Sequence, residues 1–204
     1  MIVFGLLIPL ALALLRLGTG RYLYSALTSL ACAALILLGG AQGAWALVTG
    51  LLVSVAGDWL LAHPKVCDNA FIYGVACFGA GHILFALYAS RRCAVSPWAI
   101  GVAALLAVAY GAYLFRCVLP GQPLPMKIAL SDYTLVSLLG LFFALCLDAP
   151  LAERALYALG IACILFSDTM IAEAEFVGHA RAQPLILPTY YLCHILIAAS
   201  RLIK

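Results

Sequence analysis

Residues 44–62 read AWALVTGLLVSVAGDWLLA, a run in which Asp58 is the one charged residue. A helix needs about 20 mainly apolar residues to cross the hydrocarbon core of a bilayer. This run has the required length and composition, and it lacks the period-two alternation that is typical of barrel strands. It therefore predicts a transmembrane helix that carries a carboxylic acid within its apolar part.

The rest of the chain repeats this pattern. Apolar runs bounded by glycine, proline or charged residues predict eight helices, at 2–17, 22–39, 44–62, 71–90, 96–117, 128–147, 154–173 and 184–203. Only helices and closed barrels satisfy their backbone polar groups in lipid. The expected fold class is therefore all-α, a polytopic membrane helical bundle of about eight transmembrane helices that forms one integral-membrane domain over residues 1–204.

The overall composition agrees with an integral membrane protein. Of the 204 residues, 67% are hydrophobic and 9% are charged, whereas soluble domains carry about 25% charged residues. This excludes an ordinary soluble globular protein, a nucleic-acid binder and a disordered chain. The net charge of +3 is small and scattered, so no polyanionic partner is expected. The eight cysteines have no metal-like spacing and are interpreted as small apolar residues.

The acidic residues gather at one end of the predicted bundle. An even number of crossings places both termini on a first side, so six of the eight acids fall in the half toward the opposite, second side. They are Asp58, Asp68, Asp132, Asp168, Glu173 and Glu175. A carboxylate at membrane depth costs several kcal/mol unless it is paired, hydrated or protonated, so such residues usually face a polar cavity. Five Lys and Arg residues on the first side and six on the second do not orient the chain in the membrane.

A short internal repeat links the two halves of the chain. Gly57-Asp58 is followed 24 residues later by His82-Ile83-Leu84, and Ser167-Asp168 is followed 26 residues later by His194-Ile195-Leu196. Four crossings separate the copies, so a duplication would give a 4+4 parallel repeat about an axis along the membrane normal. A chance match in a Leu-rich chain is the alternative.

Asp58 and Asp168 are the candidate catalytic residues. Two carboxyl groups in a low-dielectric cleft can differ in protonation, so that one donates a proton while the other, ionised, activates water. That division of labour is typical of a hydrolase. The alternative is that each carboxylic acid only anchors one helix to another through a hydrogen bond.

Two histidines and two tyrosines are candidate supporting residues. His82 and His194 fall near mid-membrane, where they could orient a carboxylate or relay a proton, although a buried histidine can also be a packing residue. Tyr190 and Tyr191 precede His194 by four and three residues, so at least one tyrosine shares its helix face. Tyrosine is also a common interfacial anchor.

The second side offers further candidates. Asp132 and its neighbour Tyr133, near the start of the sixth predicted helix, join the supporting or substrate-binding group. Lys127 and Arg181 are head-group candidates for a lipid phosphate, among four basic residues at this border, the others being Lys65 and Arg116. Two histidines and two aspartates would suit a divalent ion, but none of them forms a close pair such as His-x-x-x-His on one helix. The sequence therefore favours a site without a metal over a metal site, and it predicts no other cofactor.

On these residues the sequence resembles the YhhN/TMEM86 family of lysoplasmalogenases. The matching stretches are Gly57-Asp58-Trp59-Leu60-Leu61, Phe71-Ile72-Tyr73-Gly74-Val75-Ala76-Cys77-Phe78 with His82 and Tyr88, Leu165-Phe166-Ser167-Asp168, and Thr189-Tyr190-Tyr191-Leu192 with His194. Length and predicted spans agree as well, so the resemblance covers essentially the whole chain. Many members of that family have glutamine where this chain has His194, and some bacterial members have histidine there.

The resemblance implies an enzyme, a hydrolase acting on ether bonds. Its expected substrate is a lysoplasmalogen, whose vinyl ether bond would be cleaved to a fatty aldehyde and glycerophosphoethanolamine or glycerophosphocholine. Partners are then the lysophospholipid and membrane lipids, in a multi-pass protein of a bacterial inner (cytoplasmic) membrane. The competing class is a small proton-coupled transporter that uses the same acids, and a purely structural membrane subunit is third.

Overall fold

The computed structural model describes residues 2–40 and 43–203, and this part of the chain is helical throughout its regular structure. The eight α-helices are α1 (Leu7–Thr19), α2 (Tyr22–Leu38), α3 (Trp45–Ala62), α4 (Ala70–Ser90), α5 (Pro97–Tyr113), α6 (Leu124–Leu145), α7 (Leu151–Ala172) and α8 (Gln183–Leu202). Short 3₁₀ segments are η1 (Ile2–Leu6) and η4 (Ala180–Ala182), and π-helical segments are η2 (Leu114–Val118) and η3 (Glu173–Val177). The all-α fold class is confirmed.

Most helix bounds agree with the sequence pattern to within a few residues. Within the described residues, six helices are long and apolar enough to cross a membrane, and α1 and α2 are shorter apolar helices. One difference is at α6, which begins at Leu124 rather than at 128. The predicted span of 128–147 leaves Pro125 in the preceding loop, but Pro125 occupies the first turn of α6. Proline is tolerated there because the first N–H groups of a helix have no intrahelical acceptor.

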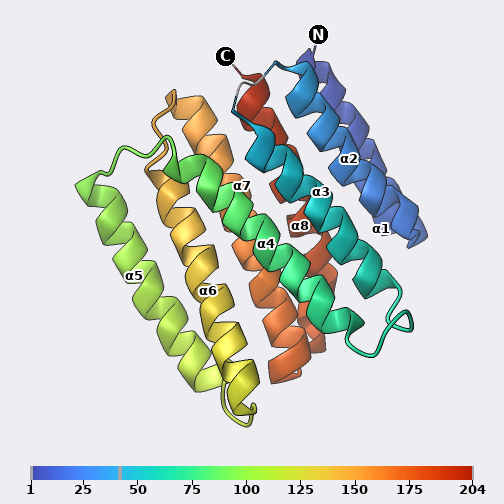
Figure 1. Cartoon of the computed structure of the whole chain (residues 1–204), viewed down its shortest axis with the longest axis vertical. Helices are drawn as coiled ribbons and strands as arrows, with labels where there is room; N and C mark the ends of the chain where they lie inside the picture. The colour runs from blue at the N-terminus through green and yellow to red at the C-terminus, as the bar shows by residue number, and fades with distance from the viewer. Residues whose placement is uncertain (1, 41–42, 204) are drawn as a thin grey trace.

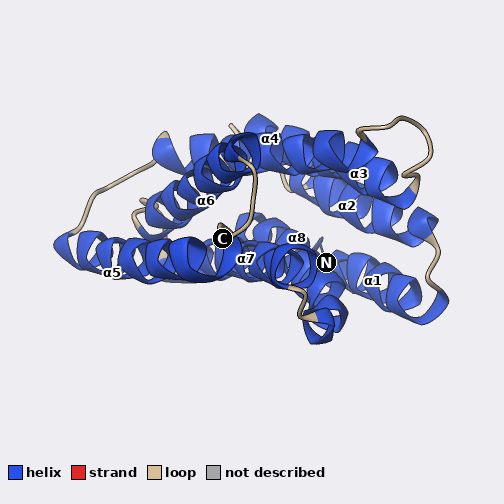
Figure 2. Cartoon of the chain, turned by 90° about the horizontal axis from the view of Figure 1, so that it is seen from below, coloured by secondary structure: helices blue, strands red, loops and turns tan. Residues whose placement is uncertain are grey.

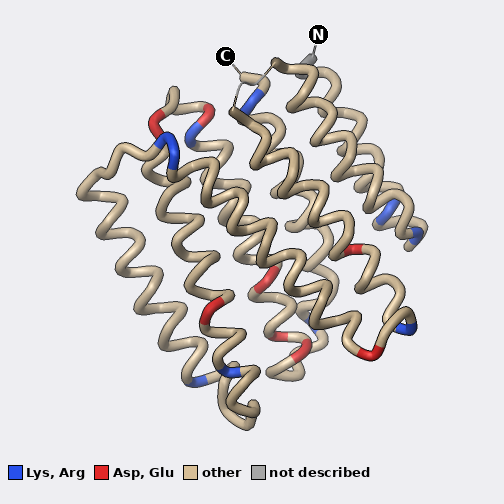
Figure 3. Tube along the Cα trace, in the orientation of Figure 1, with Lys and Arg blue, Asp and Glu red and all other residues tan. Residues whose placement is uncertain are grey.

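The bundle has two layers. Figure 2 shows α6, α4, α3 and α2 in one layer and α5, α7, α8 and α1 in the other. Both ends of the chain lie at the same end of the bundle (Figure 1), as an even number of crossings requires. Figure 3 shows most acidic positions in the half away from the termini. The chain is thus a polytopic membrane bundle whose acids are concentrated toward one side.

The two helix pairs that carry the aspartates are closely packed. A Cβ at Gly50 of α3 would lie 2.5 Å from Cε1 of the buried Phe85 on α4, and a Cβ at Gly160 of α7 would lie 3.2 Å from the backbone oxygen of Cys193 on α8. Such small residues let helices approach closely in lipid, where packing rather than the hydrophobic effect holds them together. Both glycines precede an aspartate by eight residues, so the similarity between the two halves extends to their packing.

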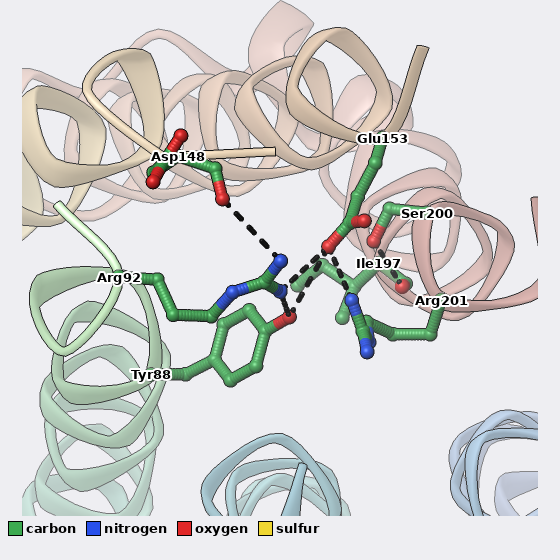
Figure 4. Close-up of polar contacts among 7 residues, drawn as sticks. All are labelled: Tyr88, Arg92, Asp148, Glu153, Ile197, Ser200 and Arg201. Atoms are coloured by element: carbon green, nitrogen blue, oxygen red, sulfur yellow. Dashed lines mark hydrogen bonds and ion pairs between the residues drawn. The ribbon is translucent and has the colours of Figure 1, made fainter. Parts of the chain in front are cut away.

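A buried ion network ties three helices together at the end that bears the termini. Glu153, 8% exposed in the first turn of α7, accepts hydrogen bonds from Arg201 of α8 and, at 2.7 Å, from Nη1 of Arg92 just beyond α4. The same Nη1 donates to the Tyr88 hydroxyl at 2.6 Å, and Arg92 Nη2 lies 3.4 Å from the backbone oxygen of Asp148 (Figure 4). This network was not predicted from the sequence, and it lies at the opposite end of the bundle from Asp58 and Asp168.

Candidate functional site

Asp58 and Asp168 line the same small pocket. It has a volume of about 60 Å³ and lies among α3, α4, α7 and α8. Its other polar residues are Ser167 and Tyr190, and its apolar walls are Leu61, Phe78, Ile164, Ile171, Ile186 and Leu187. The aspartates come from equivalent positions near the ends of α3 and α7. Their carboxyl groups can therefore act on a common set of small molecules.

The Asp58 carboxyl group is held by two hydroxyl donors. Ser25 Oγ of α2 donates to Oδ2 at 2.7 Å, and the Tyr190 hydroxyl of α8 donates to the same oxygen at 3.1 Å. Ser25 is 3% exposed and Tyr190 is also buried. The ring of Tyr190 is fixed in turn by Phe78, which it meets edge-on with centroids 5.7 Å apart. Two donors on one oxygen stabilise the ionised form of a buried carboxyl group.

Asp168 has a different environment. Its Oδ2 lies 3.1 Å from His82 Nε2, but among residues 2–40 and 43–203 no donor is aligned for a hydrogen bond to this oxygen. His82 is 4% exposed and is held by α6, since its Nε2 lies 3.2 Å from the Tyr133 hydroxyl and its Nδ1 lies 3.2 Å from Ser137 Oγ. The first-half histidine thus meets the second-half aspartate, so the site is built across the two halves of the chain.

A larger, mostly apolar cavity adjoins the small pocket. It has a volume of about 330 Å³ and lies among α4, α5, α6 and α7, with Asp168, Leu61, Phe78 and Ile171 common to both linings. Much of its wall comes from the ends of these helices that lie away from the termini, including Phe71, Ile72, Val118, Pro125, Met126 and Phe176. A volume of this size is in the range of ligand-binding sites. Asp168 is therefore the acid that faces both spaces.

A polar bridge begins at Tyr113 in the lining of this large cavity. The Tyr113 hydroxyl donates to Glu173 Oε1 at 2.7 Å, and Nδ1 of His179 contacts the other oxygen of Glu173. Tyr113 and Glu173 adjoin the two π-helical segments η2 and η3, which contact each other. Single π-turns are frequent at functional sites. Glu173 was predicted on this side of the bundle, but its partners were not predicted.

The structure leaves several candidate residues outside the two cavities. His194 is fully buried, with Nδ1 2.9 Å from Ser29 Oγ and its ring 4.4 Å from that of Tyr190, so it supports Tyr190 from behind. Tyr191 is buried and lines neither cavity. Asp132 is exposed and also lines neither, although the adjacent Tyr133 lines the large cavity.

The basic head-group candidates lie at the end of the bundle where the large cavity ends. Lys127 is half-buried in the first turn of α6, directly after Met126 of the cavity wall, and Arg181 is exposed on η4. Among the described residues, 2–40 and 43–203, no group of three or more His, Cys, Asp or Glu side chains is arranged to hold a metal ion.

Ser25 and Ser137 were not identified from the sequence. Each lies on a helix that packs against one of the histidine-bearing helices, and each contacts an acid or a histidine of the site. The sequence does contain a weak pattern that could have indicated them. Ser25 and Ser29 are four residues apart on α2, as are Tyr133 and Ser137 on α6, so each pair shares a helix face. Isolated serines are too common in membrane helices for that spacing to be recognised without the neighbouring helix.

Comparison with known proteins yields a family and one curated relative. The model of the YhhN family matches residues 20–201. The chain is 31% identical over 153 residues to a pig (Sus scrofa) protein described as "Lysoplasmalogenase TMEM86B", a match that covers 74% of this chain and 60% of that protein. The matched region therefore spans less than two thirds of the relative's length. No solved structure matches the chain.

Proposed function

This chain belongs to the YhhN family, and on that premise we propose that it is a lysoplasmalogenase. The reaction is hydrolysis of the vinyl ether bond of a 1-alkenyl lysophospholipid to a fatty aldehyde and glycerophosphoethanolamine or glycerophosphocholine. The observation that carries the proposal is that Asp58 and Asp168 line one small pocket, and that Asp168 also faces an apolar cavity. The named activity of the pig relative supports it.

The chemistry of a vinyl ether fits two carboxyl groups. Hydrolysis begins with proton addition to carbon and passes through an oxocarbenium ion that water captures, so it needs a general acid and a general base. Asp58 and Asp168 are the carboxyl groups of the small pocket. His82, Tyr133, Tyr190 and His194 are then supporting residues that hold these carboxyl groups in place.

The large cavity is suited to the single hydrocarbon chain of the substrate. Most of its lining is apolar, and its wall ends beside Lys127, where a lipid phosphate would lie at the membrane surface. Arg181 is the other head-group candidate at this border. A lysolipid of the surrounding bilayer, here proposed to be a bacterial inner membrane, could then enter sideways with its head group toward this side.

The test is turnover by the purified protein in detergent. We expect an alkenyl lysolipid to release a fatty aldehyde, while the saturated alkyl analogue with the same chain and head group binds but is not cleaved. The alkyl ether has no double bond to protonate, so no stabilised cation forms. A transporter would release no aldehyde.

The same assay tests whether the reaction needs a metal ion. Exhaustive chelation is expected to leave the rate unchanged. Activity that is lost to a chelator and restored by one divalent ion would instead assign the aspartates to metal ligation. Cleavage of the alkyl analogue would contradict the proton-transfer chemistry itself.

A further inference from the structure

We propose that the two aspartates act from separate compartments: Asp168 protonates the vinyl carbon of a lipid in the large cavity, and Asp58 activates water held in the small pocket. This assignment rests on the proposed function and adds to it which carboxyl group is the acid and which is the base. It follows from three features of the site: the two spaces, the donors around each acid, and the position of Asp168 between the spaces.

The two spaces differ in size and lining. The small pocket, of about 60 Å³, has room for on the order of two water molecules and offers the polar groups of Asp58, Asp168, Ser167 and Tyr190. The large cavity, of about 330 Å³, is mostly apolar and suits a hydrocarbon chain rather than water. A small polar pocket beside an apolar cavity can hold a reactant water next to the lipid.

The hydrogen bonds assign the base. Asp58 Oδ2 accepts from Ser25 at 2.7 Å and from Tyr190 at 3.1 Å, and both donors are hydroxyl groups that stabilise a carboxylate. Asp58 lines only the small one of these two spaces. An ionised carboxylate beside water is the arrangement of a general base.

Asp168 is assigned as the general acid because its surroundings differ from those of Asp58. Asp168 Oδ2 is buried and, within the described part of the chain, has no aligned donor, although His82 Nε2 lies 3.1 Å away. As the general acid, Asp168 must carry the proton when the lipid binds. Asp168 also lines the large cavity, so its proton can reach a carbon that lies there.

The resulting steps balance in protons and electrons. The π-electron pair of the vinyl ether takes the Asp168 proton at the carbon next to the ether-bearing carbon, which leaves an oxocarbenium ion and a carboxylate. Water adds to the ether-bearing carbon while Asp58 takes its proton, and a hemiacetal forms. The Asp58 proton then passes to the glyceryl oxygen as the carbon–oxygen bond breaks, and Asp168 takes back the hemiacetal hydroxyl proton. Aldehyde and alcohol leave, and both acids return to their starting states.

Hydrogen exchange in heavy water separates the two roles. In Asp58→Asn the oxocarbenium ion still forms but is rarely captured. Rotation about the bond between the two former vinyl carbons then lets it give its original hydrogen, rather than the added deuteron, to Asp168 as the double bond forms again. Substrate recovered from this variant is expected to carry deuterium on the vinyl carbon next to the ether-bearing carbon. In Asp168→Asn the first step fails, so recovered substrate stays unlabelled. We expect at least a tenfold difference in label between the variants. Label in Asp168→Asn, or none in Asp58→Asn, overturns the assignment.

Two further measurements keep the outcome interpretable. Binding of the saturated alkyl lysolipid reports that each variant is folded with an intact cavity. Should Asp58→Asn fail to bind it, Tyr190→Phe replaces that variant, because it removes one donor from Asp58 and keeps the ring. Its ratio of exchange to hydrolysis should rise at least fivefold over that of the unaltered protein, and an unchanged ratio overturns the assignment. If the unaltered protein produces no aldehyde, the proposed function itself has failed, which is a separate result.

Discussion

Replacement of Asp58 or Asp168 by asparagine is expected to lower the release of fatty aldehyde from an alkenyl lysolipid by about a hundredfold or more in each case. Asparagine keeps the size and most of the hydrogen bonding of aspartate but can neither supply nor accept the proton, and general acid–base catalysis contributes about 10²–10⁴-fold. The measurement is the initial rate of aldehyde formation by purified, folded variants in detergent. The loss should appear in kcat, since the groups act on the transition state rather than on binding.

Asp132→Asn is the matched control for this experiment. It makes the same chemical change at another acid in the same half of the bundle, but Asp132 is exposed and lines neither cavity. Its rate should stay within about twofold of the unaltered protein. Near-normal turnover by a folded Asp58 or Asp168 variant would remove that residue from the mechanism, and a large loss in Asp132→Asn would mean that the two cavities do not define the site.

Glu153→Ala is expected to reduce the free energy of unfolding by about 3 kcal/mol, because it leaves the Arg92 and Arg201 guanidinium groups without their carboxylate. Arg201 is largely buried and cannot regain full hydration, whereas Arg92 is one-third exposed, which moderates the cost. Tyr88 also loses its bonded neighbour (Figure 4). The measurement is reversible unfolding by denaturing detergent in mixed micelles.

Asp148→Asn is the control for this second experiment. Asp148 lies at the same end of the bundle, but its side chain is exposed and only its backbone contacts Arg92. Its substitution should change the free energy of unfolding by less than about 0.5 kcal/mol. A Glu153→Ala protein that unfolds like the control would show that the network adds nothing to stability. Because the network is remote from the aspartates, folded Glu153→Ala protein should keep its kcat.

The helical fold could be predicted because the signal is local. About 20 consecutive apolar residues define a span whatever the neighbouring helices are, and the side of the membrane follows from counting crossings. In this way the sequence placed Asp58 and Asp168 at one end of the bundle. The start of α6 was predicted four residues late because Pro125 was interpreted as a loop residue. Proline in a first helical turn gives the same sequence signal as proline in a loop.

The partners of the candidate residues depended on tertiary structure. Nothing local indicates that His82 lies beside Asp168 rather than Asp58, that Ser25 donates to Asp58, or that Glu153 holds two arginines. Nor could the sequence separate Tyr133, which faces a cavity, from its neighbour Asp132, which does not. In water, the apolar stripe of a helix marks its inner face. In lipid, apolar side chains cover both the inner and the outer face, so the rotation of each helix, and with it the composition of the site, is decided only when the helices pack.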